Sequence, residues 1–140
     1  MKKKTVDDMI SQFKEDVLTL HEYNLVKNIA NGSFDHKISQ KLGQRIYKTV
    51  KDIINSSAID QFATLLDDDN IVVAGFASQY LYPVYPKKCL DNLYAYMNSL
   101  DKDLDKMPIQ DMINGFQSNQ KFFVDGWVKL YGDNWEELEK

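Results

Sequence analysis

The stretch formed by residues 65–100 constrains the fold more than any other part of the chain. It holds an acidic turn at residues 67–69, an apolar segment of small residues, a corner with Pro83 and Pro86, and a second apolar segment. One carboxylate of an acidic turn can start a helix, because its oxygens accept hydrogen bonds from the first backbone N–H groups. Proline stops one helix but suits the first turn of the next. The stretch therefore predicts a helical hairpin, with the acidic turn and the proline corner at opposite ends of its first helix.

The rest of the chain carries the same two signals, which are capping residues and apolar residues at helical spacing. Thr5 with Asp8 predicts a capping box, Ser33 is the expected cap of the second long helix, and Ser57 with Asp60 repeats the capping pattern. Within each segment the apolar residues recur three or four positions apart, which is the spacing of one helix face. The stripes expected to be buried are Val6, Met9, Ile10, Phe13, Val17 and Leu20; Ile38, Leu42, Ile46, Val50, Ile53 and Ile54; Val73, Phe76, Ala77, Tyr80 and Leu81; and Leu90, Leu93, Tyr94, Met97 and Leu100.

The C-terminal third predicts a charged linker and then one long helix. The linker covers residues 101–106 and leads to Pro108, and the helix runs on to Gly132. Gly115 and Gly126 weaken this helix, which leaves open whether it breaks near Ser118. Alternation at period two, which a half-buried strand needs, never persists. We therefore expect one all-α domain over residues 1–140, with about six helices packed as successive hairpins.

The acidic turn and the helix behind it carry a resemblance to known helical repeats. Leu65 and Leu66 precede the aspartates, and Val72, Phe76 with Ala77, and Leu81 follow them. This segment resembles a HEAT-type repeat, in which a small-residue helix follows an acidic turn. Together with the proline corner, residues 58–100 also resemble a small bacterial family of unknown function. The resemblance implies a HEAT-like α-solenoid fragment and brings no activity with it.

The charge of the chain is unevenly distributed. Residues 1–59 carry ten basic and seven acidic side chains, whereas residues 60–140 carry seven lysines and fourteen acidic side chains. Arg45 is the only arginine. Nucleic-acid-binding proteins usually show a basic face that bears arginine, so we expect no nucleic-acid partner. An acidic surface favours a basic protein partner.

Three features indicate a cytoplasmic protein. No apolar run approaches the roughly 18 residues of a membrane span, so we expect no membrane segment. The positive start of the chain is not followed by the apolar region of a signal peptide. Cys89 is the only cysteine, which excludes an internal disulfide and fits a reducing compartment.

No motif for catalysis, for a cofactor or for a metal ion is complete. Asp101, Asp103 and Asp105 resemble the opening of a calcium loop, but Lys106 and Met112 stand where that loop needs glycine and glutamate. The two histidines have no metal-binding spacing, Cys89 has no histidine near it in sequence, and the glycines are scattered singly. The acidic turn could hold a cation, but helix capping is its ordinary role. We expect no catalytic, cofactor-binding or metal-binding residues.

Five tyrosines gather around the proline corner. Tyr80 and Tyr94 lie on the predicted buried stripes, whereas Tyr82, Tyr85 and Tyr96 do not. Exposed tyrosine beside acidic residues is typical of a recognition surface, because tyrosine offers a large contact area at low entropic cost. The predicted partner-binding residues are Asp67, Asp68, Asp69, Tyr82, Tyr85 and Tyr96.

These observations favour a small acidic helical protein that binds another protein and is not an enzyme. Its sharpest form is an immunity-type or antitoxin-type inhibitor of a basic toxin. The alternative is a HEAT-like adaptor or regulatory module. A hydrolase whose carboxylates converge from separate helices is a third hypothesis, which a linear sequence cannot test.

Overall fold

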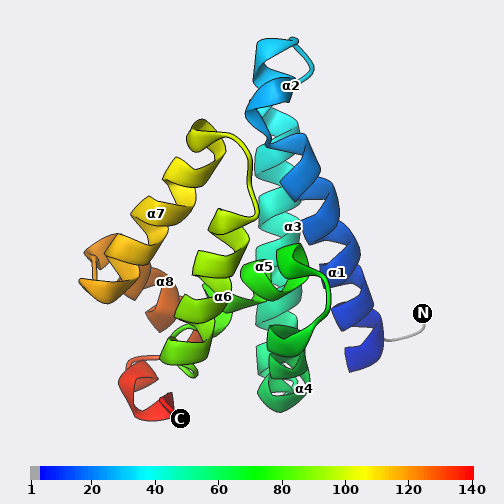
Figure 1. Ribbon diagram of the computed structural model, residues 1–140. Helices are drawn as coiled ribbons and strands as arrows, with labels where there is room; N and C mark the ends of the chain where they lie inside the picture. Colours follow the sequence, from blue (N-terminus) through cyan, green and yellow to red (C-terminus); the bar gives the residue numbers. More distant parts are fainter. Residues whose placement is uncertain (1–3) are drawn as a thin grey trace. The chain divides into compact units, whose positions relative to one another are not determined.

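A computed structural model describes residues 4–140. Met1, Lys2 and Lys3, the first part of the positive start, lie outside the described residues. The prediction of an all-α protein is confirmed, since 77% of the chain is helical and no strand is found in the described part. In chain order the elements are α1 (Val6–Tyr23), α2 (Val26–Ala30), α3 (His36–Asn55), α4 (Ile59–Ala63), the 3₁₀ helix η1 (Thr64–Asp67), α5 (Ile71–Leu81), α6 (Pro86–Asn98), α7 (Asp103–Gln117), α8 (Lys121–Tyr131) and the 3₁₀ helix η2 (Trp135–Leu138) (Figure 1).

The described residues thus form eight α-helices where about six were expected. The number rises because a separate short helix, α2, follows α1 after Tyr23, and because the helix expected to run to Gly132 is interrupted at Ser118. Within residues 4–140, no helix has the length and apolar character needed to cross a membrane. The chain divides into two compact units, Met1–Phe62 and Ala63–Lys140. That they form one domain, and that the helices follow a HEAT-like arrangement, stay predictions.

The first unit is built on the antiparallel pair α1 and α3 (Figure 1). The predicted capping box is confirmed: Thr5 Oγ1 accepts a hydrogen bond from the Asp8 N–H at 3.0 Å, and Asp8 Oδ2 accepts one from the Thr5 N–H at 3.1 Å. The rings of Phe13 and Phe62 meet edge to face, with centroids 5.0 Å apart, inside a core that excludes water. The fully buried apolar side chains of this unit are Phe13, Val17, Ile46, Val50, Ile53 and Phe62.

Two expectations for α3 are wrong. Asp35, and not Ser33, caps the helix, and its side chain accepts a hydrogen bond from the Lys37 N–H at 2.9 Å. Because α3 begins at His36, Asp35 stands directly before the first free N–H groups. Ile38, expected on the buried stripe, is 50% exposed, since burial on α3 begins further along at Ile46.

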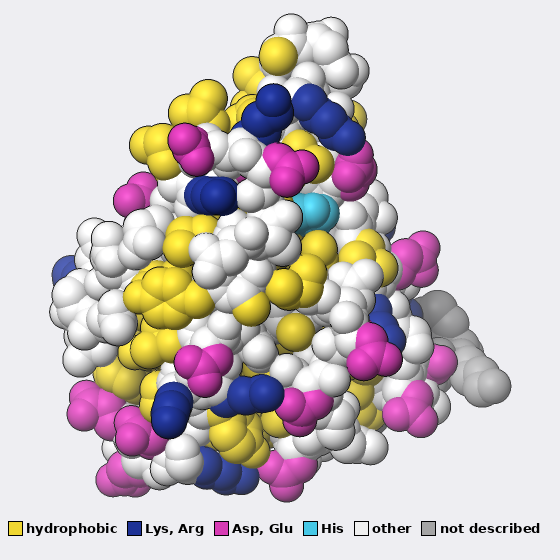
Figure 2. All heavy atoms as spheres, in the orientation of Figure 1, with side chains coloured by type: hydrophobic (Ala, Val, Ile, Leu, Met, Phe, Trp, Pro, Cys, Tyr) yellow, Lys and Arg dark blue, Asp and Glu magenta, His cyan; other side chains and the backbone are white. Residues whose placement is uncertain are grey.

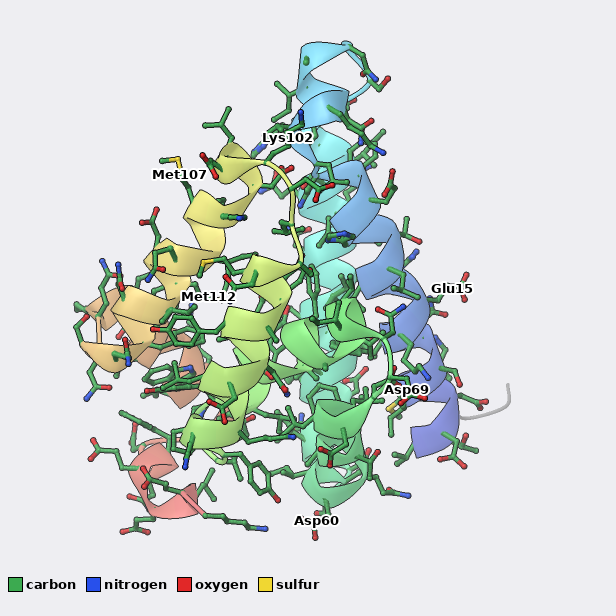
Figure 3. The ribbon with its side chains drawn as sticks, viewed as in Figure 1. Glu15, Asp60, Asp69, Lys102, Met107 and Met112 are labelled. Atoms are coloured by element: carbon green, nitrogen blue, oxygen red, sulfur yellow. The ribbon has the colours of Figure 1, made fainter. Side chains whose placement is uncertain are left out.

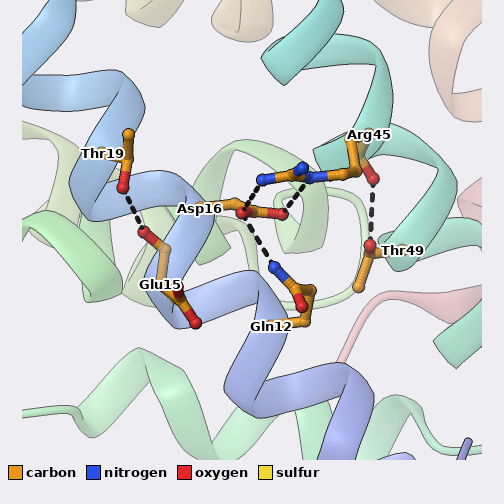
Figure 4. A network of polar contacts seen from close by, with 6 residues as sticks. All are labelled: Gln12, Glu15, Asp16, Thr19, Arg45 and Thr49. Atoms are coloured by element: carbon orange, nitrogen blue, oxygen red, sulfur yellow. Dashed lines mark hydrogen bonds and ion pairs between the residues drawn. The ribbon is translucent and has the colours of Figure 1, made fainter.

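An ion pair joins the two long helices of this unit (Figure 4). The Asp16 side chain on α1 is almost fully buried, and it accepts hydrogen bonds from Arg45 Nε at 3.0 Å and Arg45 Nη2 at 2.5 Å. Gln12 Nε2 donates a third bond to the same carboxylate at 2.9 Å. The bond to Asp16 raises the pKa of the Arg45 guanidinium. The only arginine of the chain therefore neutralises a buried carboxylate.

The second unit is built on the hairpin of α5 and α6, and the predicted helix ends at the proline corner are confirmed. α5 ends at Leu81, and Pro86 is in the first turn of α6. The predicted aspartate cap is wrong, because α5 begins at Ile71 and Asn70 therefore stands at the cap. The Asn70 side chain accepts hydrogen bonds from the N–H groups of Val72 and Val73.

Gly75 lets α6 approach α5 closely. A Cβ at this position would lie 2.8–2.9 Å from the Tyr96 side chain, so the Tyr96 ring packs directly on the α5 backbone. Tyr96 is consequently only 5% exposed and Tyr94 is 38% exposed, which reverses the expectation for both residues. The buried stripe of α6 is Cys89, Leu93 and Tyr96.

We expect Gly75→Ala to destabilise the protein by about 1 kcal/mol or more. Overpacking a tight core costs about 1–3 kcal/mol, which outweighs the gain of up to ~1 kcal/mol for replacing a helical glycine. Gly126→Ala in α8 is the matched control, because its new methyl group meets open space and should stabilise the protein. The free energy of unfolding from urea denaturation measures both effects, and a Gly75→Ala variant as stable as the parent would contradict this packing.

The remaining helices differ from the predicted linker and long helix. α7 already begins at Asp103, so most of the expected linker is helical and Pro108 lies inside the helix. The sequence left open a break near Ser118; the structure has one there, and Asn119 in this turn has a positive φ of 52°. The turn brings Phe123 of α8 against Phe116 of α7, with ring centroids 4.8 Å apart.

Candidate functional site

The corner between α5 and α6 is a tight turn whose backbone groups bond locally. The N–H groups of Val84 and Tyr85 donate to the Leu81 carbonyl at 2.9 and 3.0 Å. Pro83 and Val84 are buried, whereas Tyr82 and Tyr85 are partly exposed. The prolines thus fix a turn that presents two tyrosines, as the sequence predicted.

The C-terminal segment returns to this corner. Gly132 ends α8 with a φ of 91°, a conformation that glycine adopts readily. Trp135 of η2 then packs against Trp127 of α8, with ring centroids 4.9 Å apart. Further on, the Lys140 N–H donates to the Val84 carbonyl at 2.7 Å, and Lys140 Nζ lies 5.6 Å from the centre of the Tyr85 ring. The segment is therefore attached to the corner at both of its ends.

A cluster of aromatic rings packs against the corner. The Tyr82 ring lies 4.8 Å from the Phe116 ring and 5.5 Å from the Trp127 ring, measured between centroids. The Tyr131 hydroxyl donates a hydrogen bond to the Tyr80 carbonyl at 2.5 Å, which joins α8 to the last turn of α5. Such offset rings pack tightly, so the Tyr82 side chain is held in one position.

An open cleft of about 190 Å³ lies between the corner and the returning C-terminal segment, and we call it the corner cleft. Its apolar walls come from Tyr82, Pro83, Pro86 and Trp135, and its polar groups come from Asn119, Glu136 and Glu139. Both glutamates are exposed. Burial, and secondly the charge of Glu139, raises the pKa of the Tyr82 hydroxyl. Figure 2 shows acidic side chains over the C-terminal segment at the lower left.

The acidic turn lies at the other end of α5, as predicted, and each aspartate has a different environment. Asp67 forms an ion pair with Lys88 at 2.9 Å, and Asp68 Oδ1 accepts a hydrogen bond from the Asn70 N–H at 2.9 Å. Asp69 is exposed (Figure 3). Asp68 thus stabilises the turn. Of the three aspartates, Asp69 is the one most accessible to a partner.

Of the six predicted partner-binding residues, the structure brings only Tyr82 and Tyr85 together at the corner. Asp67, Asp68 and Asp69 belong to the acidic turn, and Tyr96 is buried between α5 and α6. Sequence reasoning missed Trp135, Glu136 and Glu139. The available signal was a tryptophan followed by glutamates directly after the helix stop at Gly132.

The remaining candidates for metal binding or catalysis have structural roles. In residues 4–140 no three His, Cys, Asp or Glu side chains lie close enough to hold a metal ion. Asp103 and Asp105 form the first turn of α7, where negative charge stabilises a helix. Burial raises the pKa of the Cys89 thiol to about 12, so little of the reactive thiolate exists near neutral pH.

Two further surfaces lie outside the corner cleft. A hollow of about 350 Å³ between the ends of α1 and α3 is lined by Gln12 and Asp52, but Gln12 bonds Asp16 and Asp52 pairs with Lys48. On α7, Leu104 and Met107 are exposed and lie three positions apart; Figure 3 labels Met107. The corner cleft places two aromatic rings beside exposed carboxylates, which neither of these surfaces does.

Comparison with family models, with curated proteins and with solved structures finds no match to this chain.

Proposed function

We propose that the chain is a protein-binding module that binds a basic protein partner, with the corner cleft at the centre of the interface. The cleft is the observation that carries this proposal. It places two aromatic side chains and two prolines beside two exposed glutamates. Aromatic anchors surrounded by a polar rim are typical of the residues that dominate binding energy in protein interfaces.

The charge of the second unit supports a basic partner. Residues 63–140 carry seven lysines and thirteen acidic side chains, so the unit has a net charge of −6. Long-range attraction raises the rate of encounter with an oppositely charged protein and decreases as salt screens it. A compact acidic helical protein of this kind is suited to an immunity-type or antitoxin-type inhibitor of a basic toxin, which is the particular role that we propose.

A carboxylate-based hydrolase has less support. Asp16 is the one buried carboxylate in the described part of the chain, and Arg45 and Gln12 bind it. The carboxylates at the corner cleft, Glu136 and Glu139, are exposed to water. A catalytic carboxyl group usually lies in a site from which water is excluded, and neither glutamate is buried.

The test begins with affinity capture from the native cell, followed by association and dissociation rates at two salt concentrations. Neutralising Glu136→Gln and Glu139→Gln together should slow association and reduce its salt dependence, because these charges attract the partner. Trp135→Leu should instead speed dissociation, at a cost of about 2 kcal/mol if Trp135 is a central anchor.

The matched control for charge is Asp101→Asn with Asp111→Asn, which removes the same charge from exposed positions of the same unit away from the cleft. This control should change the association rate less than the glutamate pair does. The proposal fails if the captured partners are not basic proteins, or if both corner variants bind with unchanged rates.

A further inference from the structure

We infer that the corner cleft receives one arginine side chain of the partner, with its alkyl part on the aromatic and proline walls and its guanidinium on Glu136 and Glu139. This inference rests on the proposed function and names the chemistry that the same site recognises. Lysine would fit the same cleft with weaker hydrogen bonding.

The size of the cleft suits a single long side chain. Its volume of about 190 Å³ is below the ~300–1,000 Å³ typical of pockets that hold drug-sized ligands. An α-helix with its side chains is about 10–12 Å across, which is too wide for a cleft of this size. A single long side chain suits it, while the rest of the interface lies on the surrounding surface.

The walls of the cleft are fixed before a ligand arrives. Trp135 is packed on Trp127, and the Tyr82 ring contacts the rings of both Phe116 and Trp127. Pro86 holds the start of α6. Because these side chains lose little freedom on binding, the contact of an alkyl chain with them keeps most of its favourable free energy.

The two glutamates are spaced so that they act together. Glu136 belongs to η2 and Glu139 follows its end, three residues later. Residues three apart along a 3₁₀ helix lie on one side, and both side chains line the cleft. A guanidinium donates from several N–H groups in one plane and can bridge two carboxylates, whereas an ammonium is a point charge.

A lysine of the chain itself shows that this corner accepts a cation. Lys140 Nζ lies 5.6 Å from the centre of the Tyr85 ring, within the range of a cation–π contact. Tyr85 is next to Pro86 of the cleft, and Lys140 is next to Glu139. A basic side chain of the chain itself therefore already contacts an aromatic ring beside the cleft, although neither of these two residues lines the cleft.

Argininamide is the probe for this inference, and the indole N–H signal of Trp135 in ¹H–¹⁵N NMR spectra is the readout. The full chain has two tryptophans, so a Trp127→Phe spectrum assigns both signals. We expect a saturable shift of the Trp135 signal with argininamide. Citrullinamide, whose side chain has the same length but is uncharged, should give none.

Variants locate the binding. Glu136→Gln with Glu139→Gln should weaken argininamide binding by about fivefold, because two exposed charge contacts are lost. Glu137→Gln is the matched control, since Glu137 is an exposed glutamate of η2 that does not line the cleft, and it should change the affinity by less than about twofold. The inference is overturned if the Trp135 shift does not saturate, if citrullinamide gives the same shift, or if Glu137→Gln weakens binding as much as the pair does.

Failure of this inference is distinguishable from failure of the proposed function. If a basic partner is captured and the cleft does not bind argininamide, the module binds its partner without an arginine in the cleft. If the cleft binds argininamide and no basic protein is captured, the cleft recognises a cation and the proposed partner class is wrong.

Discussion

Raising the pH from about 8 to about 11 is expected to remove about 6 kcal/mol from the free energy of unfolding of the unit Ala63–Lys140. In the folded unit, the side chains of Cys89, Tyr96 and Tyr131 keep their protons, because burial raises the pKa of each. In the unfolded chain these groups lose their protons near pH 8.5 for cysteine and 10 for tyrosine. Each group then favours unfolding by about 1.4 kcal/mol for each pH unit above that value.

The sign of this effect follows from the proton count. Above its unfolded-state pKa, each of the three groups binds fewer protons when the chain is unfolded, so stability decreases as the pH rises. The decrease from Cys89 continues up to its folded pKa of about 12. The proton of Tyr131 is additionally needed for the hydrogen bond to the Tyr80 carbonyl. A loss of about 6 kcal/mol is comparable to the whole stability of many domains.

Urea denaturation followed by tryptophan fluorescence measures this unit, since Trp127 and Trp135 both belong to it. Cys89→Ala should reduce the loss of stability between pH 9 and 11 by about 1.4 kcal/mol for each pH unit. Below pH 8 the difference between the variant and the parent should not depend on these protons. Parallel pH profiles for the parent and Cys89→Ala would show that the buried thiol does not control alkaline stability.

The helix boundaries were predictable where one residue alone could serve as the cap. Thr5 with Asp8, the two prolines and Gly132 act within a single turn, and all were predicted in the roles that they have. Around the other helix starts, several good capping residues stand close together. Asp35 was preferred over Ser33, and Asn70 over the aspartates before it, because the packing of the helix fixes its first residue.

The orientation of α6 could not be derived from its own sequence. Tyr94 continues the apolar stripe of Leu90, Leu93 and Met97, whereas Tyr96 lies off it, so the pattern favoured Tyr94. The choice depends on Gly75 in the preceding helix, which leaves space for one aromatic ring against its backbone. The same contact removes Tyr96 from the predicted recognition surface.

The candidate site was predictable only where it is formed by residues that are close in sequence. The proline corner is local, so the sequence placed Tyr82 and Tyr85 there. The opposite side of the corner cleft comes from residues that lie some fifty positions further along the chain and return to Val84 through the Lys140 backbone. No spacing rule connects Tyr82 with Trp135, because their proximity depends on how α7 and α8 pack.

Replacing Arg45 with methionine is expected to destabilise the unit Met1–Phe62 by about 3 kcal/mol. Asp16 is 1% exposed, and without Arg45 its carboxylate keeps only the bond from Gln12. Removing one partner of a buried ion pair typically costs about 3–5 kcal/mol, because an uncompensated charge remains in the interior. The lower end applies here, since the Arg45 side chain is 60% exposed and water can approach the vacated position. Urea denaturation followed by far-ultraviolet circular dichroism measures the loss.

Two further variants separate the charge of Arg45 from its other contacts. Lys48→Met removes an exposed lysine from the same helix, where it pairs with Asp52 at 2.8 Å, and should cost less than about 1 kcal/mol. Asp16→Leu combined with Arg45→Met removes both charges and should restore most of the lost stability, since an apolar pair of similar volume avoids the cost of burying ions. Two outcomes would show that the buried carboxylate is not the cause of the lost stability. In the first, Lys48→Met would destabilise the protein as much as Arg45→Met does; in the second, the double variant would be the least stable of the three. The only arginine of the chain would then stabilise the α1–α3 pair through its aliphatic packing.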